Sequence, residues 1–283
     1  MGIKEDAHFD KILRDIKSVK IQGAENVAKA GIKAFLLKPT AKSAKKIASV
    51  RPTEPLLQNS LKILLNSKNM KLTANKILRE IEKSHERISK KGATLIKNGM
   101  NIYTHCHSSS VVDIIKYAKK KQKKNFVVYT TEVEPLLQGR MTAKELASMG
   151  INVIIFPDLS AGMALKKCDL FLFGADAYTK KYVVNKIGTS TLVKISEHYK
   201  VPRYSCGVSM KFTKKVKIEK RGGKEVWDER DKNISVENYA FDKTRLVWLT
   251  GIISEFGILK PKDFVRKARE NLKEKLCNIK NFS

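Results

Sequence analysis

Long apolar runs and paired cysteines are both missing from this sequence. No apolar stretch approaches the roughly 18 to 20 residues that a membrane helix needs, and the first residues are too polar for a signal peptide. The four cysteines, Cys106, Cys168, Cys206 and Cys277, are far apart with no CxxC pair, so we expect neither a disulfide framework nor a structural zinc site. Free thiols indicate a reducing compartment and hence a cytoplasmic protein, with no membrane partner.

Negative charge is also scarce. The 283-residue chain has 57 Lys and Arg against 28 Asp and Glu, which gives a net charge of +29. Such an excess attracts polyanions. The lysines are nevertheless spread along the chain, and runs such as 117–124 and 266–276 are typical of solvated helix faces. Without a zinc-finger or RNP-type motif, nucleic acid stays an alternative partner and a small phosphate-bearing substrate is preferred.

The chain divides near residue 95 into two parts with different periodicity. With 42% hydrophobic and 30% charged residues it has the composition of a globular protein. In the first part, apolar residues recur with helical spacing, and the stretches KPT and RPTEP interrupt the pattern. The expected helices lie within residues 8–19, 24–37, 56–67 and 73–98. We therefore predict a helical N-terminal domain, 1–95, followed by a Rossmann-like domain, 96–283.

After residue 100, short apolar runs alternate with amphipathic stretches. The expected strands lie within residues 101–105, 126–130, 152–157, 170–174, 203–208 and 246–253. The expected helices lie within residues 110–120, 142–150, 160–168 and 189–200, with a last one from about Lys262. This alternation predicts an α/β fold with a doubly wound parallel sheet. Residues 215–231 are typical of an extended hairpin, with turn glycines at Gly222 and Gly223.

Residues that directly follow strands gain functional weight in such a sheet, because ligands bind beyond the carboxyl ends of the strands. Cys106 and Asp176 each follow an expected strand. Asn185 and Lys186 lie at a strand-to-helix turn, where Gly188 lets backbone N–H groups approach an anion. We expect a phosphate to dock at that helix N-terminus.

Three interpretations of Cys106 compete, namely a buried inert thiol, a metal ligand and a reactive thiol. His105 and His107 flank it and point to opposite faces if the strand continues. The three residues therefore do not easily share one metal ion, and a metal site is not favoured.

The remaining cysteines and Asp158 have ordinary structural interpretations. Cys168 and Cys206 are expected in the core, and Cys277 in a terminal helix without a partner. Asp158 also ends a strand, where we expect it to cap the following helix.

A set of motifs resembles one known superfamily. The motifs are THCHSSS at 104–110, TEVEPLLQGRMTAKELASMGI at 131–151, GADAYT at 174–179, VVNKIGTSTLV at 183–193, NYAFDKT at 238–244 and GIISEFGILKP at 251–261. Together they resemble the superfamily of methylthioribose-1-phosphate isomerase, archaeal ribose-1,5-bisphosphate isomerase and the regulatory subunits of translation initiation factor two B. The resemblance runs from about Ile21 to Pro261, and HCHSSSVVDII and TAKELASMGINVI look like the archaeal branch.

The resemblance implies an enzyme. In the isomerases the strand-end cysteine and the GAD aspartate are the catalytic pair, which regulatory subunits commonly lack, and this chain has Cys106 and Asp176. We therefore predict an aldose-ketose isomerase that converts ribose 1,5-bisphosphate to ribulose 1,5-bisphosphate. The alternatives are a methylthioribose-1-phosphate isomerase and a non-catalytic regulatory subunit like those of initiation factor two B. The family implies no metal or nucleotide cofactor, allows AMP as an activator within nucleotide salvage, and forms homo-oligomers, either dimers or rings of dimers.

Two titratable groups suit this reaction, in which a proton moves between adjacent carbons while a ring oxygen gains a proton and a hydroxyl loses one. We expect Cys106 to serve the carbons and Asp176 the oxygens. A helix N-terminus would lower the pKa of the thiol from about 8.5, and a dry pocket would raise the pKa of the carboxyl.

The resemblance also implies the residues that bind the substrate, with departures from the family pattern. Gln22 stands where an arginine usually precedes Gly-Ala, Glu134 stands where an arginine usually precedes proline, and Gly207 replaces a glutamate. Fewer arginines mean fewer bidentate contacts to phosphate. The predicted binding residues are Gln22, Gly23, Ala24, Arg51, Gln138, Asn185, Lys186 and Lys211.

Overall fold

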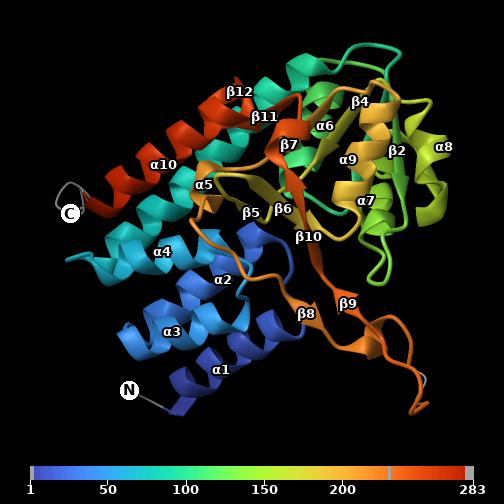
Figure 1. Cartoon of the computed structure of the whole chain (residues 1–283). Coiled ribbons are helices and arrows are strands. Elements are labelled where there is room, and N and C mark those ends of the chain that lie inside the picture. Colours follow the sequence, from blue (N-terminus) through green and yellow to red (C-terminus); the bar gives the residue numbers. More distant parts are fainter. Residues whose placement is uncertain (1–2, 229–230, 278–283) are drawn as a thin grey trace.

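The computed structural model describes residues 3–228 and 231–277. Within these residues, five α-helices come before the first strand, shown in blue and cyan in Figure 1. They are α1 (Ile3–Lys17), α2 (Ala24–Leu37), α3 (Ala41–Val50), α4 (Pro55–Leu65) and α5 (Met70–Gly92). Four of them match predicted segments, and α3 was missed because its buried Ala44 and Ile47 are separated by lysines. A capping box between Thr40 and Ser43 begins α3, and Asn69 caps α5.

Seven strands of the described part of the chain form one sheet, in the order β12-β11-β7-β4-β1-β2-β3. They are β1 (Asn101–His105), β2 (Val127–Thr131), β3 (Asn152–Phe156), β4 (Leu170–Phe173), β7 (Arg203–Cys206), β11 (Gly251–Ser254) and β12 (Gly257–Leu259). The pairs are parallel except β11 with β12, which are antiparallel. The predicted α/β fold class is therefore confirmed.

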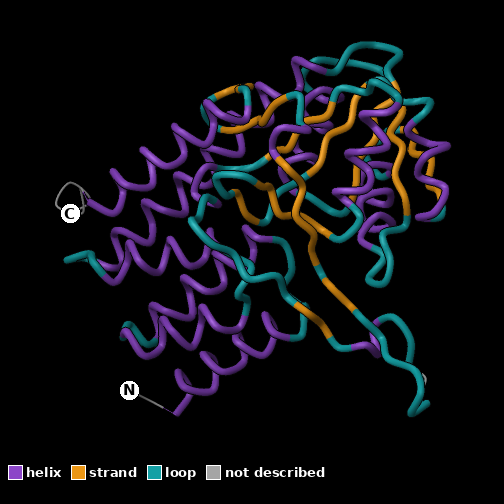
Figure 2. Tube along the Cα trace, in the orientation of Figure 1, coloured by secondary structure: helices purple, strands orange, loops and turns teal. Residues whose placement is uncertain are grey.

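Helices cover both faces of this sheet, as Figure 2 shows for the orange strands among the purple helices. These helices are α6 (Ser109–Lys120), α7 (Gln138–Ala147), α8 (Ala161–Leu165), α9 (Thr189–His198) and α10 (Pro261–Cys277). Side chains alternate along β1, so that Ile102 joins a hydrophobic cluster with α5, α6 and α7, while Tyr103 joins a second cluster with α8, α9 and α10. Burial on both faces explains why the central strand β4 is entirely apolar.

Smaller elements complete the structure. A second sheet has the order β10-β6-β5, from β5 (Ala177–Tyr178), β6 (Tyr182–Lys186) and β10 (Phe241–Arg245). Short 3₁₀ helices are η1 (Ala93–Leu95), η2 (Asp158–Ser160), η3 (Ser209–Lys211), η4 (Gly223–Glu225) and η5 (Leu246–Trp248). The predicted strand at 246–253 is wrong over its first half, because Leu246 to Trp248 form η5. The predicted helix at 160–168 is shortened to α8.

The predicted hairpin is an arm, residues 215–239, of which 229–230 lie outside the described residues. Its strands β8 (Lys220–Arg221) and β9 (Asn238–Tyr239) are antiparallel, and Figure 1 shows the segment between them leading away from the sheet. The prediction of a tight turn at Gly222 and Gly223 is wrong, because a long connection, beginning with η4, follows β8 directly.

A single hydrophobic cluster crosses residue 95, from Phe9 of α1 through Ile115 of α6 to Ile253 of β11. The division into domains 1–95 and 96–283 therefore stays a prediction. No helix in the described residues is long and apolar enough to span a bilayer.

Candidate functional site

The site lies where the strand order changes direction. β1 and β4 are neighbours, yet the chain continues from β1 to β2 on one side and from β4 toward β7 on the other. His105 pairs with Phe173 at the carboxyl ends of the two strands, so the loops that carry Cys106 and Asp176 leave the sheet side by side. Open α/β sheets bind ligands at such a switch point, because the diverging crossovers leave a crevice there.

A cavity of about 120 Å³ opens at this point. Every residue predicted for the site lines it. They are Cys106, Asp176, Gln22, Gly23, Ala24, Arg51, Gln138, Asn185, Lys186 and Lys211. The walls come from the loops after β1 and β4, the end of β6, the N-terminus of α2, the loop between α3 and α4, and η3.

Cys106 is half-buried and holds a left-handed backbone conformation, with φ of 66°. The Thr142 hydroxyl donates to its carbonyl oxygen at 3.0 Å, which fixes this uncommon geometry. Burial raises the pKa of the thiol to about 12, the nearby Asp176 adds to the rise, and the positive charge of Lys186 opposes it. The predicted lowering of the thiol pKa is therefore wrong, because loss of solvation outweighs the charge of Lys186 and the backbone hydrogen bond from His107.

Asp176 is the second titratable group of the cavity. Burial raises the pKa of its carboxyl, and the charges of Lys211, Arg51 and Lys186 oppose that rise. The direction agrees with the prediction of a carboxyl in a dry pocket. Its backbone N–H donates to the Val184 carbonyl at 2.8 Å, which ties the loop after β4 to β6.

Close approach of two loops requires glycine before Asp176. A Cβ atom on Gly174 would lie 2.6 Å from Oγ of Ser108, in the loop after β1. The missing side chain lets the two strand ends converge on the cavity.

The N-termini of α2, α6 and α7 reach the cavity, through Ala24, Ser109 and Gln138. Neither Gly23 nor Ser108 makes a side-chain capping bond within the described residues. Uncapped first-turn N–H groups favour an anion. The predicted phosphate site at the N-terminus of α9 is not supported, because the Asp242 carboxylate already accepts from the Ser190 N–H at 2.9 Å.

Neither histidine beside Cys106 faces a metal site. Burial lowers the pKa of His105 to about 4, and its Nε2 lies 3.0 Å from the Ile187 carbonyl oxygen. His107 Nδ1 lies 3.0 Å from the hydroxyl of Thr142. Among residues 3–228 and 231–277, no group of three or more His, Cys, Asp and Glu is arranged to hold a metal ion.

Asp158 does not cap the following helix, contrary to prediction. Its carboxylate accepts from the backbone N–H groups of Val133 and Glu134 at 2.9 and 2.7 Å. It thus binds the loop after β2 to the end of β3. Cys168 and Cys206 are buried, as predicted, and Cys277 is exposed in α10.

Three charged residues of the cavity were missed from the sequence, namely Glu25, Glu54 and Arg221. The only available signal for Glu54 was its place in RPTEP, three residues after Arg51. Arg221 gave no signal, because the arm brings it to the cavity from far along the chain.

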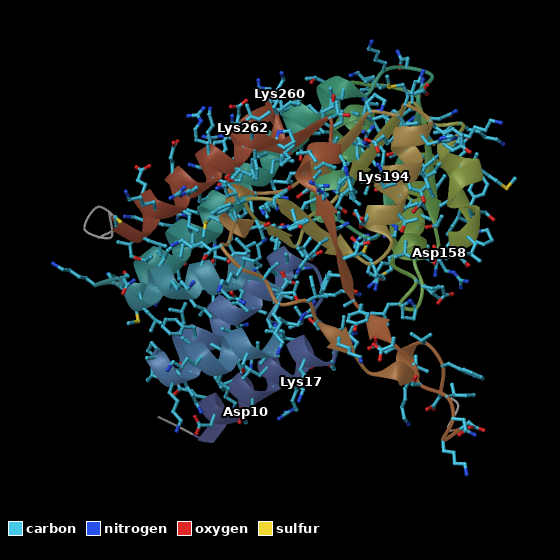
Figure 3. The ribbon with its side chains drawn as sticks, in the orientation of Figure 1. Asp10, Lys17, Asp158, Lys194, Lys260 and Lys262 are labelled. Carbon is cyan, nitrogen blue, oxygen red and sulfur yellow. The ribbon has the colours of Figure 1, made fainter. Side chains whose placement is uncertain are left out.

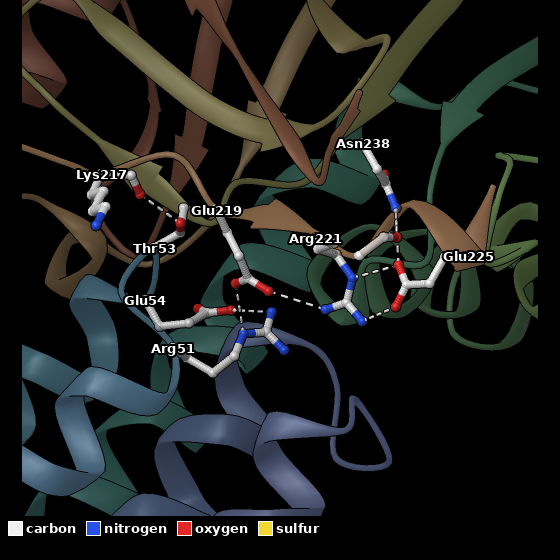
Figure 4. A network of polar contacts seen from close by, with 9 residues as sticks. Arg51, Thr53, Glu54, Lys217, Glu219, Arg221, Glu225 and Asn238 are labelled. Carbon is white, nitrogen blue, oxygen red and sulfur yellow. Dashed lines mark hydrogen bonds and ion pairs between the residues drawn. The ribbon is translucent and has the colours of Figure 1, made fainter. Parts of the chain in front are cut away.

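Glu54 and Arg221 belong to a network of charges shown in Figure 4. Arg51 contacts Glu54 at 3.3 Å and Glu219 at 3.2 Å, and Glu219 contacts Arg221 at 3.0 Å. Arg221 also pairs with Glu225 through two guanidinium nitrogens. The network joins the arm to the loop between α3 and α4 along one wall of the cavity.

Residues 24–261 match the Initiation factor 2 subunit family. This chain belongs to that family.

A ribose 1,5-bisphosphate isomerase of Methanocaldococcus jannaschii is 32% identical over 276 residues, covering 87% of this chain and 89% of that protein. A putative translation initiation factor eIF-2B subunit 2-like protein of Pyrococcus horikoshii is also 32% identical, over 89% of this chain and 96% of that protein. The crystal structure of Pyrococcus horikoshii OT3 translation initiation factor eIF-2B has a TM-score of 0.84 at 30% identity, covering 94% of this chain and all of that one. The family recognised from the sequence motifs is thus confirmed.

The positive charge of this family member is dispersed over its surface. Figure 3 labels Lys17 on α1, Lys194 on α9, and Lys260 and Lys262 around the start of α10. These lysines lie on separate parts of the molecule. The cations that line the cavity are instead Arg51, Lys186, Lys211 and Arg221.

Proposed function

We propose that this protein is a sugar-phosphate isomerase that converts an aldose phosphate to a ketose phosphate. The observation that carries the proposal is that the thiol of Cys106 and the carboxyl of Asp176 line one cavity together with four cationic side chains. A proton-transfer pair beside cations suits a reaction that needs acid-base chemistry on an anionic sugar. The similarity to ribose 1,5-bisphosphate isomerases supports it.

Asp176 holds the proton that the first step requires. In the proposed mechanism it protonates the ring oxygen as the bond between that oxygen and C1 breaks. Its raised pKa favours the protonated form that this step needs. The resulting carboxylate later takes the proton of the C2 hydroxyl, which becomes the ketone.

Cys106 moves the proton between carbons. As a thiolate it removes the proton from C2, which leaves a double bond between C1 and C2, and then returns the proton to C1. Because burial raises the thiol pKa to about 12, the thiolate is the minor form at neutral pH but a strong base. Lys186 is the cation whose charge favours it.

Ribose 1,5-bisphosphate is the first candidate substrate, with methylthioribose 1-phosphate as the second. Cations that reach the cavity from different elements, Arg51 before α4 and Lys186 at the end of β6, suit a ligand with two phosphates. Asn185 and Gln138 are proposed to bind sugar hydroxyls, with Gln22, Gly23 and Ala24 at one phosphate. The Oε1 atom of Gln138 is buried without a hydrogen-bond partner in the described structure, which leaves it free for a ligand.

We also propose that the protein is a cytoplasmic homo-oligomer, a dimer or a ring of dimers, activated by AMP. Ile154 and Ile155 on the edge strand β3, with Leu159 and Met163 beside it, are exposed apolar side chains that support a second copy as the partner. Light scattering and assays with AMP test these two points.

A non-catalytic role as a regulatory subunit is the second candidate. The similarity to proteins named as subunit 2-like translation initiation factors favours it, and so does a thiol that holds its proton. In that case the cavity would bind a sugar phosphate without turning it over.

The deciding experiment incubates the purified protein with ribose 1,5-bisphosphate and quantifies ribulose 1,5-bisphosphate directly. A parallel reaction uses methylthioribose 1-phosphate, and C106S serves as the blank for contaminating activity. We expect turnover of the bisphosphate by the natural chain alone. Absence of turnover with both substrates would contradict the isomerase proposal.

A further inference from the structure

Glu54 is a buried carboxyl with one unused oxygen at the cavity. It is fully buried, and its Oε1 accepts from Nη2 of Arg51 at 3.3 Å. Its Oε2 has no hydrogen-bond partner among the described residues, and neither has Nη1 of Arg51. Both residues line the cavity, so an unused carboxyl oxygen and an unused guanidinium nitrogen stand at the same wall. Buried polar atoms are seldom left unpaired, which points to a ligand.

The charge balance of the network explains which state Glu54 adopts. Three carboxyls, those of Glu54, Glu219 and Glu225, meet the two guanidinium groups of Arg51 and Arg221. Glu219 contacts both arginines, and Glu225 pairs bidentately with Arg221. Glu54 has a single long contact and the deepest burial. Excess negative charge at a buried site favours the neutral form of the least paired carboxyl, which in this network is that of Glu54.

The groups that face Glu54 from neighbouring elements lead to the same state. They are Arg51 before α4, Asp176 after β4, Lys211 of η3 and Glu219 before β8. Burial raises the pKa of Glu54 to about 8, and the negative charge of Asp176 adds to the rise, while Arg51 and Lys211 oppose it. At neutral pH the carboxyl is therefore largely protonated and can donate a hydrogen bond.

We propose that Glu54 is a further substrate-binding residue, which in its protonated form donates a hydrogen bond from Oε2 to a phosphate oxygen held by Nη1 of Arg51. This inference rests on the proposed function only in taking the cavity for a sugar-phosphate site. An ionised Glu54 would repel the phosphate, so at pH values above the pKa of Glu54, where the free protein carries the carboxylate, binding takes up one proton. Glu54 thus makes phosphate affinity depend on pH.

The experiment measures binding of ribose 5-phosphate and of inorganic phosphate by calorimetry between pH 7.5 and 9.5. In this range ribose 5-phosphate is close to fully dianionic, since the second pKa of a phosphate ester is about 6, and the proton counts are therefore taken from this probe. Titrations in two buffers with different ionisation heats count the protons taken up. We expect close to one proton per ligand at the alkaline end, and an affinity that falls by up to about tenfold per pH unit above the pKa of Glu54.

Three variants test whether Glu54 is the group that takes up the proton on ligand binding. E54Q keeps a neutral donor of the same shape, so it should bind at pH 7.5 with an affinity near that of the natural chain and show little dependence on pH. E25Q removes another cavity carboxyl that is ionised throughout the range, and should leave proton uptake unchanged. K186M tests the one cavity cation whose pKa burial lowers, and it should also retain the uptake.

At the alkaline end of the range, proton uptake below about 0.2 per ligand in the natural chain would overturn the inference. Uptake that survives in E54Q would overturn it as well. Failure of either probe to bind at pH 7.5 would overturn it too. Carbon-13 NMR of the glutamate carboxyls gives a readout on the unliganded natural chain, where titration of Glu54 below pH 5 would count against the proposal. Binding needs no turnover. A protein that shows no isomerase activity but takes up a proton through Glu54 on binding would therefore contradict the isomerase proposal alone.

Discussion

The side-chain ammonium of Lys211 lies 2.5 Å from the carbonyl oxygen of Ala175, the residue before Asp176. Lys211 was predicted to hold phosphate, but this bond also fixes the loop that carries Asp176. Its charge is the largest one opposing the raised pKa of that carboxyl. Lys211 therefore sets both the position and the acidity of Asp176.

Replacing Lys211 by methionine should lower kcat/KM by roughly 10- to 100-fold, the size expected for one lost charge-assisted hydrogen bond. The pKa of Asp176 should rise further, so the limb of the kcat profile that follows Asp176 should move to higher pH. K180M removes an exposed lysine just after β5 and serves as the control. A kcat profile in K211M with no limb shifted would contradict this role.

Substitutions of the proposed catalytic pair, Cys106 and Asp176, should cause the largest losses of activity. C106S and D176N should each lower kcat by about 10² to 10⁴-fold, the usual contribution of a positioned acid or base. Circular dichroism and urea unfolding should show folded proteins in both cases. Near-normal turnover in either variant would remove that residue from the mechanism.

Alkylation should distinguish the buried thiol from the exposed one. Because the pKa of Cys106 is raised to about 12 and Cys277 is exposed, iodoacetamide at pH 8 should modify Cys277 first. Modification of Cys106 should speed up as pH rises toward 10, with Cys277 as the internal reference. Peptide mass spectrometry follows both sites, and rapid labelling of Cys106 at pH 7 would show that the thiolate is the resting form.

Acid should weaken the ion pair between Glu25 and His85, whose Oε2 and Nε2 atoms lie 2.9 Å apart. Burial opposes ionisation of Glu25, but His85 and Lys29 overcome it and lower its pKa to about 2. The pair therefore stabilises the fold above the unfolded pKa of about 4.5, and this contribution is lost as pH falls toward 2. Urea unfolding should show E25Q less stable by on the order of 1 to 3 kcal/mol at pH 6 and by less at pH 3. E82Q, at an exposed position on α5, is the control.

Gly139 should tolerate no side chain. An added Cβ would lie 1.7 Å from the carbonyl oxygen of Thr131, a backbone atom that cannot rotate away. G139A should therefore destabilise the protein by about 2 kcal/mol or more and disturb Gln138 in the cavity. G162A, where the nearest atom lies 3.9 Å away, should be neutral in the same thermal unfolding experiment.

The local pattern of apolar and polar residues was sufficient to predict the strands and the helix that position the site. NIYTH and LFLFG are continuous apolar runs, and the polar residues after them had to leave the sheet at its carboxyl edge, which placed Cys106 and Asp176 together. α2 was predicted with its observed bounds, because its apolar spacing and its glycine N-cap are both local signals.

Features that depend on distant packing were not predictable. Arg221 reaches the cavity only because the arm lies against the loop that contains Arg51. The pKa of the Cys106 thiol depends on how much solvent the folded loops exclude. The carboxylate of Asp158 accepts hydrogen bonds from a loop more than 20 residues earlier in the sequence. No spacing within a short window encodes such contacts.

The cavity draws its walls from Val19 to Phe241, so most of the chain lies between its first and last contributors. A ligand bound in the cavity contacts segments that are distant in the sequence, so it acts as a non-covalent cross-link. The ligand must dissociate before the chain can unfold. Occupancy at 100 times the dissociation constant would raise the free energy of unfolding by about 2.7 kcal/mol. Hydrogen exchange should consequently slow in amides far from the cavity, including those of α5 and α8, because a ligand that stabilises the whole fold also makes global unfolding rarer.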